Sequence, residues 1–157
     1  MRVKWVLLSL FCAFLPLVSI SARAADDDIY VCVVAILAHD RSNEIEPKLR
    51  CLAKEIQKRD ATLTCFRLKT LNCKPVTVGV KETFALVEGE VACVTVLQGF
   101  DKDDKVRLNV KGPKLSEIAY TTTCGKFFPL TTGYLTKDKD TLIIGVMVRS
   151  PECKGKK

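Results

Sequence analysis

Cysteines are the residues of this chain with the widest choice of chemistry. The 157 residues include eight cysteines, and Cys12 lies in an apolar N-terminal run. None of the others forms a Cys-x-x-Cys motif, which argues against a thioredoxin-like redox site. The single histidine, His39, gives little support to a zinc site. The seven remaining cysteines are therefore expected to pair as disulfides, with one left free or joined to a second chain: Cys32, Cys51, Cys65, Cys73, Cys93, Cys124 and Cys153.

Their pairing is not fixed by spacing, but the surrounding residues suggest one bridge. Cys51 lies in a predicted helix, and Cys73 lies in a predicted loop before Pro75. We expect these two to be joined. Cys32 and Cys93 lie within apolar strand patterns and are interpreted as small buried hydrophobic residues.

Cys124 is the best candidate for a nucleophile, because it stands at a predicted strand end before Gly125. His39 would act as its base and Arg149 would stabilise an anion. The order of these three residues, and the threonines that precede Cys124, resemble sortase transpeptidases, which are exported β proteins. No pattern around His39 matches that family's histidine segment. A cysteine-dependent enzyme using Cys124 with His39 is kept as an alternative to Cys124 in a disulfide or in the core.

Two acidic turns offer oxygen ligands of the kind that calcium prefers. Neither has the glycine and the distal glutamate of a calcium loop, and aspartates are ordinary turn residues. A calcium-dependent surface module is a second alternative. No glycine-rich phosphate loop or Gly-x-Ser-x-Gly motif occurs, so the sequence predicts no catalytic residue, cofactor or metal and no enzymatic activity. The aspartates of these turns are Asp101, Asp103, Asp104, Asp138 and Asp140.

The N-terminus has the features of a secretory signal peptide. Arg2 and Lys4 precede an apolar run over residues 5–20, and Ala22 and Ala24 form an Ala-x-Ala site. The run is shorter than the roughly 20 residues of a membrane span. We predict a signal peptide over residues 1–24, cleaved between Ala24 and Ala25, and a periplasmic or secreted mature protein with no membrane segment.

The charge of the chain excludes one class of partner. The net charge is +7, with 25 basic and 18 acidic residues; without Arg2, Lys4 and Arg23 it is 22 against 18, or +4. The basic residues are dispersed rather than gathered in a stripe with aromatics, which argues against nucleic-acid binding. The expected partner is an unknown protein or surface, and the odd cysteine allows a disulfide-linked dimer.

Periodicity predicts one helix among many strands. Residues 29–38 are apolar on both faces, as in a central strand. Residues 47–59 carry an apolar stripe at helical spacing, and residues 62–69 alternate weakly, which suggests a βαβ unit. Further strands are expected at 76–80, 84–87, 91–97, 105–110, 118–123, 127–135 and 142–148. The prediction is an α+β domain over residues 25–150, with one helix packed on a mostly antiparallel sheet or sandwich, followed by a flexible basic tail at 151–157.

Several segments resemble small exported bacterial proteins of no known activity. These segments are Val34-Ala35-Ile36-Leu37-Ala38 leading to Glu46-Pro47-Lys48-Leu49, then Lys74-Pro75-Val76, then Gly125-Lys126-Phe127-Phe128. The resemblance spans most of the predicted mature chain and implies a strand–helix–strand start, a β meander and export. It implies no activity, so the sequence favours a non-enzymatic binding or structural domain.

Overall fold

The computed structural model describes residues 29–151. The predicted signal peptide, the cleavage site at Ala24 and Ala25, and the predicted tail beyond Pro151 lie outside the described residues. Within the described range, no helix is long and apolar enough to cross a bilayer.

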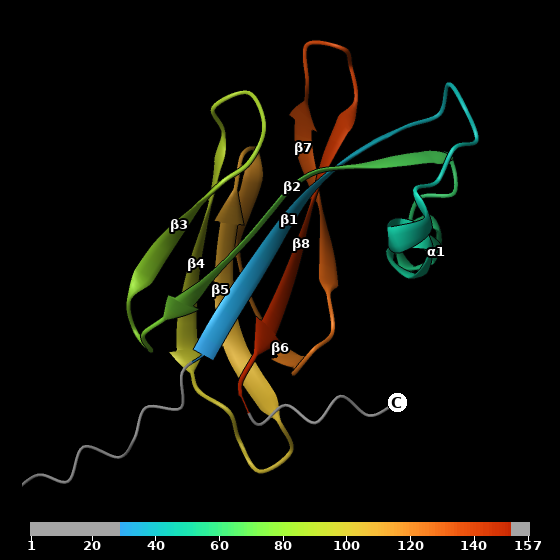
Figure 1. The fold of residues 1–157 in the computed structure, drawn as a ribbon. Coiled ribbons are helices and arrows are strands. Elements are labelled where there is room, and N and C mark those ends of the chain that lie inside the picture. Colours follow the sequence, from blue (N-terminus) through green and yellow to red (C-terminus); the bar gives the residue numbers. More distant parts are fainter. Residues whose placement is uncertain (1–28, 152–157) are drawn as a thin grey trace, which may run out of the picture.

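Residues 29–151 form a sandwich of two four-stranded sheets, with a single short helix against one of them (Figure 1). Sheet A has the strand order β2-β1-β8-β7 and sheet B the order β3-β4-β5-β6, and neighbouring strands in both sheets are antiparallel. The predicted α+β class, with one helix on antiparallel sheets, is confirmed. The strands are β1 (Ile29–His39), β2 (Cys65–Val76), β3 (Lys81–Ala85), β4 (Val91–Gln98), β5 (Lys105–Gly112), β6 (Leu115–Thr123), β7 (Phe128–Leu135) and β8 (Thr141–Arg149).

The main core lies between the sheets and follows the period-two alternation of each strand. In β5, Val106, Leu108 and Val110 are fully buried and point into this core, as their alternation with polar residues predicts. The two central strands of sheet A, β1 and β8, are buried on both faces, which explains their nearly continuous apolar sequences.

The helix covers part of the outer face of sheet A. A 3-10 turn (Pro47–Leu49) leads into α1 (Arg50–Gln57), close to the predicted range of 47–59. Leu52, Ala53 and Ile56 are the buried residues of α1, and they pack with outward-facing residues of β1 and β8 in a second core. The described part of the chain therefore has three layers where the helix lies and two elsewhere.

The predicted βαβ unit is wrong. β1 and β2 are direct antiparallel neighbours, and the helix lies in the loop between them rather than in a parallel crossover. The sequence pattern predicts that the second strand ends at residue 69, whereas β2 runs from Cys65 to Val76 and passes through Pro75. Proline is tolerated there because β2 is an edge strand, so the missing amide would have faced no neighbour.

Side chains close the two open edges of the sandwich. On one edge, Lys74 of β2 donates to Glu82 at 2.6 Å and to the Thr83 carbonyl at 2.9 Å, both on β3. An inward-pointing charge of this kind also blocks pairing with another chain. On the other edge, Tyr120 of β6 stacks on Phe128 of β7, with ring centroids 4.4 Å apart.

Candidate functional site: an apolar groove between the helix and sheet A

The residues of the cysteine-nucleophile hypothesis lie at opposite ends of sheet A. His39 ends β1, and its Nδ1 accepts a hydrogen bond from the Arg41 amide. Gly125, next to Cys124, donates to Val148, the partner of Val31 at the other end of β1. His39 lies eight residues along β1 from Val31, a distance of about 26 Å. Cys124 is disulfide-bonded, so it has no thiol that His39 could deprotonate, as the hypothesis requires.

The acidic turns use their carboxylates within the protein. Asp101 accepts backbone hydrogen bonds from Asp103 and Lys105, which lower the pKa of its carboxyl group, the Lys105 bond most. Asp140 is buried and forms ion pairs with Arg41 and Arg67, so two positive charges already neutralise it. Among residues 29–151, no cluster of three potential ligands is placed to hold a metal ion.

The predicted Cys51–Cys73 disulfide is wrong, because Cys73 is bonded to Cys32. The two residues are direct partners in the β1–β2 register, with Cα atoms 4.0 Å apart. The interpretation of Cys32 as an unpaired hydrophobic residue fails for the same reason. Cys51 is a free, exposed thiol; Cys65 and Cys93 are also free, the first of them buried.

A groove of about 400 Å³ separates α1 from the outer face of sheet A. It exists because α1 has only eight residues and covers only part of this face. Most of the lining is aliphatic or aromatic, with a few charged residues and one thiol. The lining residues are Val34, Lys48, Leu49, Cys51, Leu52, Glu55, Leu68, Leu71, Gly125, Lys126 and Phe127.

Gly145 leaves room for residues that line the groove to pack together against sheet A. Gly145 of β8 is the direct partner of Val34 on β1. A Cβ atom at position 145 would lie 2.5 Å from Val34 Cγ2, 3.4 Å from Phe127 and 3.5 Å from Leu52. Contacts below about 3.5 Å between carbons are repulsive. The absence of a side chain at Gly145 therefore lets three lining residues from different elements meet.

Two lysines give the groove a positive edge. Glu55 accepts a hydrogen bond from Lys58 at 2.7 Å, which is the main reason that the pKa of Glu55 is lowered. Lys48 and Lys126 also line the groove, and none of the ion pairs in residues 29–151 involves either of them. The charge of Lys126 also contributes to the lowered pKa of Glu55, but neither ammonium group is held in one of these ion pairs, so both can attract a negatively charged partner.

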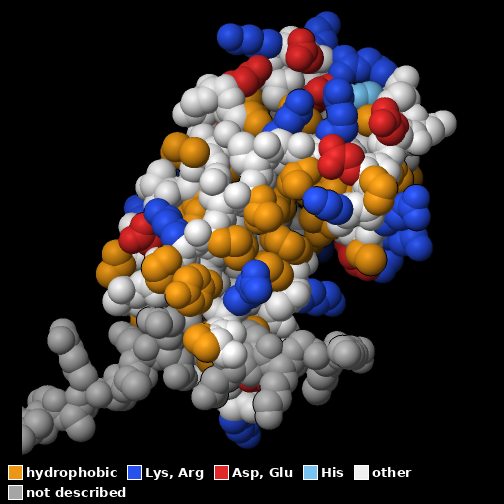
Figure 2. Space-filling view, in the orientation of Figure 1, with side chains coloured by type: hydrophobic (Ala, Val, Ile, Leu, Met, Phe, Trp, Pro, Cys, Tyr) orange, Lys and Arg blue, Asp and Glu red, His pale blue; other side chains and the backbone are white. Residues whose placement is uncertain are grey.

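The apolar surface continues from the groove along sheet A. Leu71 lines the groove and is 54% exposed, and Tyr30 further along the sheet is 39% exposed. Figure 2 shows hydrophobic side chains gathered across the middle of this face. Natural proteins seldom leave such a contiguous apolar surface without a binding role.

No motif in the sequence marks the groove residues as a binding site. The sequence singles out Cys51, but for a disulfide. Leu71 could not be identified, because a β-bulge at Ala35/Ile36 shifts the register of β2 and decides which of its residues face outward. A usable signal was the helix itself, which is too short to cover a four-stranded sheet. Comparison of the chain with protein-family models, with curated proteins and with solved structures finds no match.

Proposed function

We propose that the protein is a non-enzymatic, exported binding domain and that the groove between α1 and sheet A holds its partner. The observation that carries the proposal is an apolar groove with two unpaired lysines at its edge, on a face that the helix leaves partly open. A concave apolar site with a few polar groups is the usual form of a binding site.

The partner is a protein segment with a large apolar side chain flanked by acidic residues. The apolar side chain would contact Leu52, Leu71 and Phe127. Carboxylates beside it would face Lys48 and Lys126, which favour an acidic partner over a basic one. An extended segment fits better than a compact small molecule, because the apolar surface runs beyond the groove toward Tyr30.

Selection of displayed random peptides against the full chain tests this proposal. We expect enriched peptides to combine an apolar residue with Asp or Glu, and their affinity to fall with added salt. Bound peptide should also slow alkylation of the exposed Cys51 thiol. The proposal would be contradicted if basic or purely polar peptides were enriched, or if bound peptide did not slow the alkylation of Cys51. Binding of small amphiphiles alone would show that the ligand is not a protein segment.

Two exposed leucines provide a matched pair of variants for this test. Leu71 is 54% exposed and lines the groove, and Leu135 is 56% exposed and does not. Leu71→Lys should weaken peptide binding about tenfold or more, as expected for an apolar contact in a binding hot spot. Leu135→Lys should bind as the parent does. Equal effects of the two changes would count against the groove.

Export rests on the N-terminal pattern and on the disulfide. A Cys32–Cys73 bond is compatible with an extracellular location, because disulfides persist in oxidising compartments. We propose, from the resemblance of its sequence, that the chain belongs with small exported bacterial proteins of the periplasm or exterior. Expression of the full chain in a secreting bacterium should yield protein that starts at Ala25. Cell-retained protein that still carries residues 1–24 would refute export.

Cys51 also supports a disulfide-linked dimer as a second candidate. It is the exposed free thiol among the described residues. Under oxidising conditions we expect a dimer on non-reducing gels that disappears in Cys51→Ser. A dimer that persists in Cys51→Ser would exclude this linkage.

A further inference from the structure

The Cys32–Cys73 disulfide lies at the surface, in a pocket of its own. Cys32 is on the central strand β1 and is 1% exposed, whereas Cys73 is on the edge strand β2 and is exposed. The pocket has a volume of about 310 Å³ and is lined by Tyr30, Cys32, Cys73, Arg149, Ser150 and Pro151. An incoming group can therefore reach the Cys73 side of the bond and not the Cys32 side.

Backbone pairing also joins the two strands that the disulfide links. β1 and β2 pair over the full length of β1, from Ile29 opposite Val76 to His39 opposite Cys65. The ladder continues on both sides of the Cys32–Cys73 pair. We therefore expect the sheet to stay paired after the bond is cleaved, so that the chemistry takes place in the folded protein.

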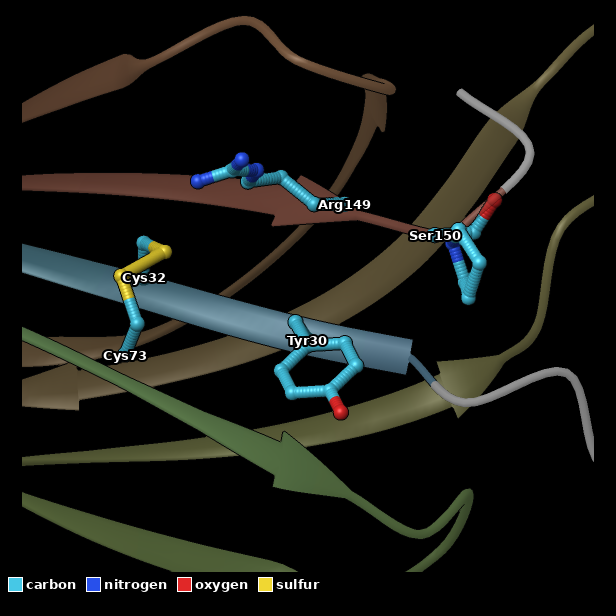
Figure 3. Close-up of a pocket in the computed structure, with 6 residues that line it drawn as sticks. Tyr30, Cys32, Cys73, Arg149 and Ser150 are labelled. Atoms are coloured by element: carbon cyan, nitrogen blue, oxygen red, sulfur yellow. A yellow bond between two sulfur atoms is a disulfide. The ribbon is translucent and has the colours of Figure 1, made fainter.

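Arg149 gives the pocket a positive charge. In Figure 3 the Arg149 side chain extends from β8 toward the end of the pocket that holds the disulfide. Tyr30 lies on β1, between the disulfide and Ser150 along the strand direction. No ion pair within residues 29–151 involves Arg149. A nearby guanidinium attracts an anionic reactant and stabilises thiolates.

We propose that this pocket is a thiol–disulfide exchange site for a small thiol that carries carboxylates, of the glutathione class. The thiolate sulfur attacks Cys73 Sγ and forms a mixed disulfide. The Cys32–Cys73 bond breaks, and its electron pair leaves on Cys32 as a thiolate, which takes up a proton from water. Attack by a second thiol on the mixed disulfide releases the oxidised small-molecule disulfide and leaves Cys73 reduced. The pocket shares no lining residue with the peptide groove, although Tyr30 lies on the surface that the proposed segment would follow.

Thiol exchange on the native full chain tests the site. Reduced glutathione, which is anionic, is compared with cysteamine, which is cationic, and adducts are located by peptide mapping after acid quench. We expect a single adduct at Cys73, with a rate that rises in proportion to thiolate concentration. Arg149→Gln should slow the glutathione reaction about fivefold, as loss of one partly screened charge implies, and should not slow the cysteamine reaction.

Arg107→Gln is the matched control, because Arg107 is an exposed arginine on sheet B. Its reaction with either thiol should match that of the parent protein. A rate that saturates at low thiol concentration would show that unfolding limits attack, and an adduct at Cys32 would show attack from the other side. Either result overturns the proposal, as does equal loss of rate in Arg149→Gln and Arg107→Gln. Peptide binding at the groove has no part in these outcomes.

Discussion

Substitution of Gly145 by alanine tests how tightly the lining of the groove is packed. The new Cβ would lie 2.5 Å from Val34 Cγ2, about 1 Å inside ordinary carbon–carbon contact. Val34 is 4% exposed and β-branched, so it has little freedom to rotate away. Overpacking of this kind costs about 1–3 kcal/mol, while the Gly→Ala change recovers about 0.4–1 kcal/mol through the unfolded chain. We expect a net loss of about 1–2 kcal/mol in the free energy of unfolding.

Val34→Ala should relieve the clash that Gly145→Ala creates. Alone, Val34→Ala removes two methyl groups from a buried site, which costs about 2 kcal/mol with the cavity included. In the double variant the alanine at 145 enters part of the vacated space. The double variant should therefore be about as stable as Val34→Ala alone, with a coupling energy of about 1–2 kcal/mol.

Urea denaturation followed by circular dichroism measures these free energies. Gly99→Ala is the matched control, because a Cβ at Gly99 meets its nearest atom at an ordinary 3.6 Å. It should leave stability unchanged or slightly raised. Additive losses in the double variant to within about 0.5 kcal/mol, or a stabilising Gly145→Ala change, would refute the packing described for the groove.

Three further predictions concern polar contacts outside the groove. Lys74→Met keeps the aliphatic stem but removes the bridge between β2 and β3; unfolding free energy should fall by about 1 kcal/mol, and light scattering should show more association at the freed edge. Glu88 accepts a hydrogen bond from the Tyr134 hydroxyl, which lowers the pKa of Glu88 from 4.5 and raises that of Tyr134 to about 12. The contribution of the Glu88 carboxylate to the free energy of unfolding is thus present above pH 4.5 and lost as the pH falls through its lowered pKa. The difference in that free energy between the parent and Glu88→Gln should therefore shrink in acid. Tyrosinate absorbance should show Tyr134 ionising at lower pH in the variant. Asp140→Asn leaves two arginines without their buried partner and should cost about 1–3 kcal/mol in urea denaturation, less than a fully buried pair because both arginines are partly exposed; an unchanged stability would show that the pair is dispensable.

Local pattern predicted most elements of the fold. The strand that begins at Ile29, the helix after Pro47 and the one-sided strand around Leu108 all have periodicities set by nearest neighbours, and each is found within a few residues of its expected range. Pairing was harder to predict. Whether β1 pairs with β2 directly or is separated from it by another strand depends on contacts between residues far apart in the sequence. The periodicity of a single strand carries no information about such contacts.

The disulfide and the groove could not be predicted for the same reason. Proline at position 75 suggested a loop around Cys73, but an edge strand accepts proline, and only the register of β1 with β2 places Cys73 opposite Cys32. The groove depends on what the helix leaves uncovered. That is a property of its length relative to the sheet and of the small Gly145, rather than of any motif.

Methyl and amide NMR of the parent protein with a selected acidic, apolar peptide shows directly whether the groove is the binding site. We expect chemical-shift changes to concentrate on the groove, at Val34, Leu52, Leu71 and Phe127, with none on the outer face of sheet B around Arg107. Shift changes centred on sheet B, or spread evenly over both sheets, would contradict the assignment of the groove as the binding site.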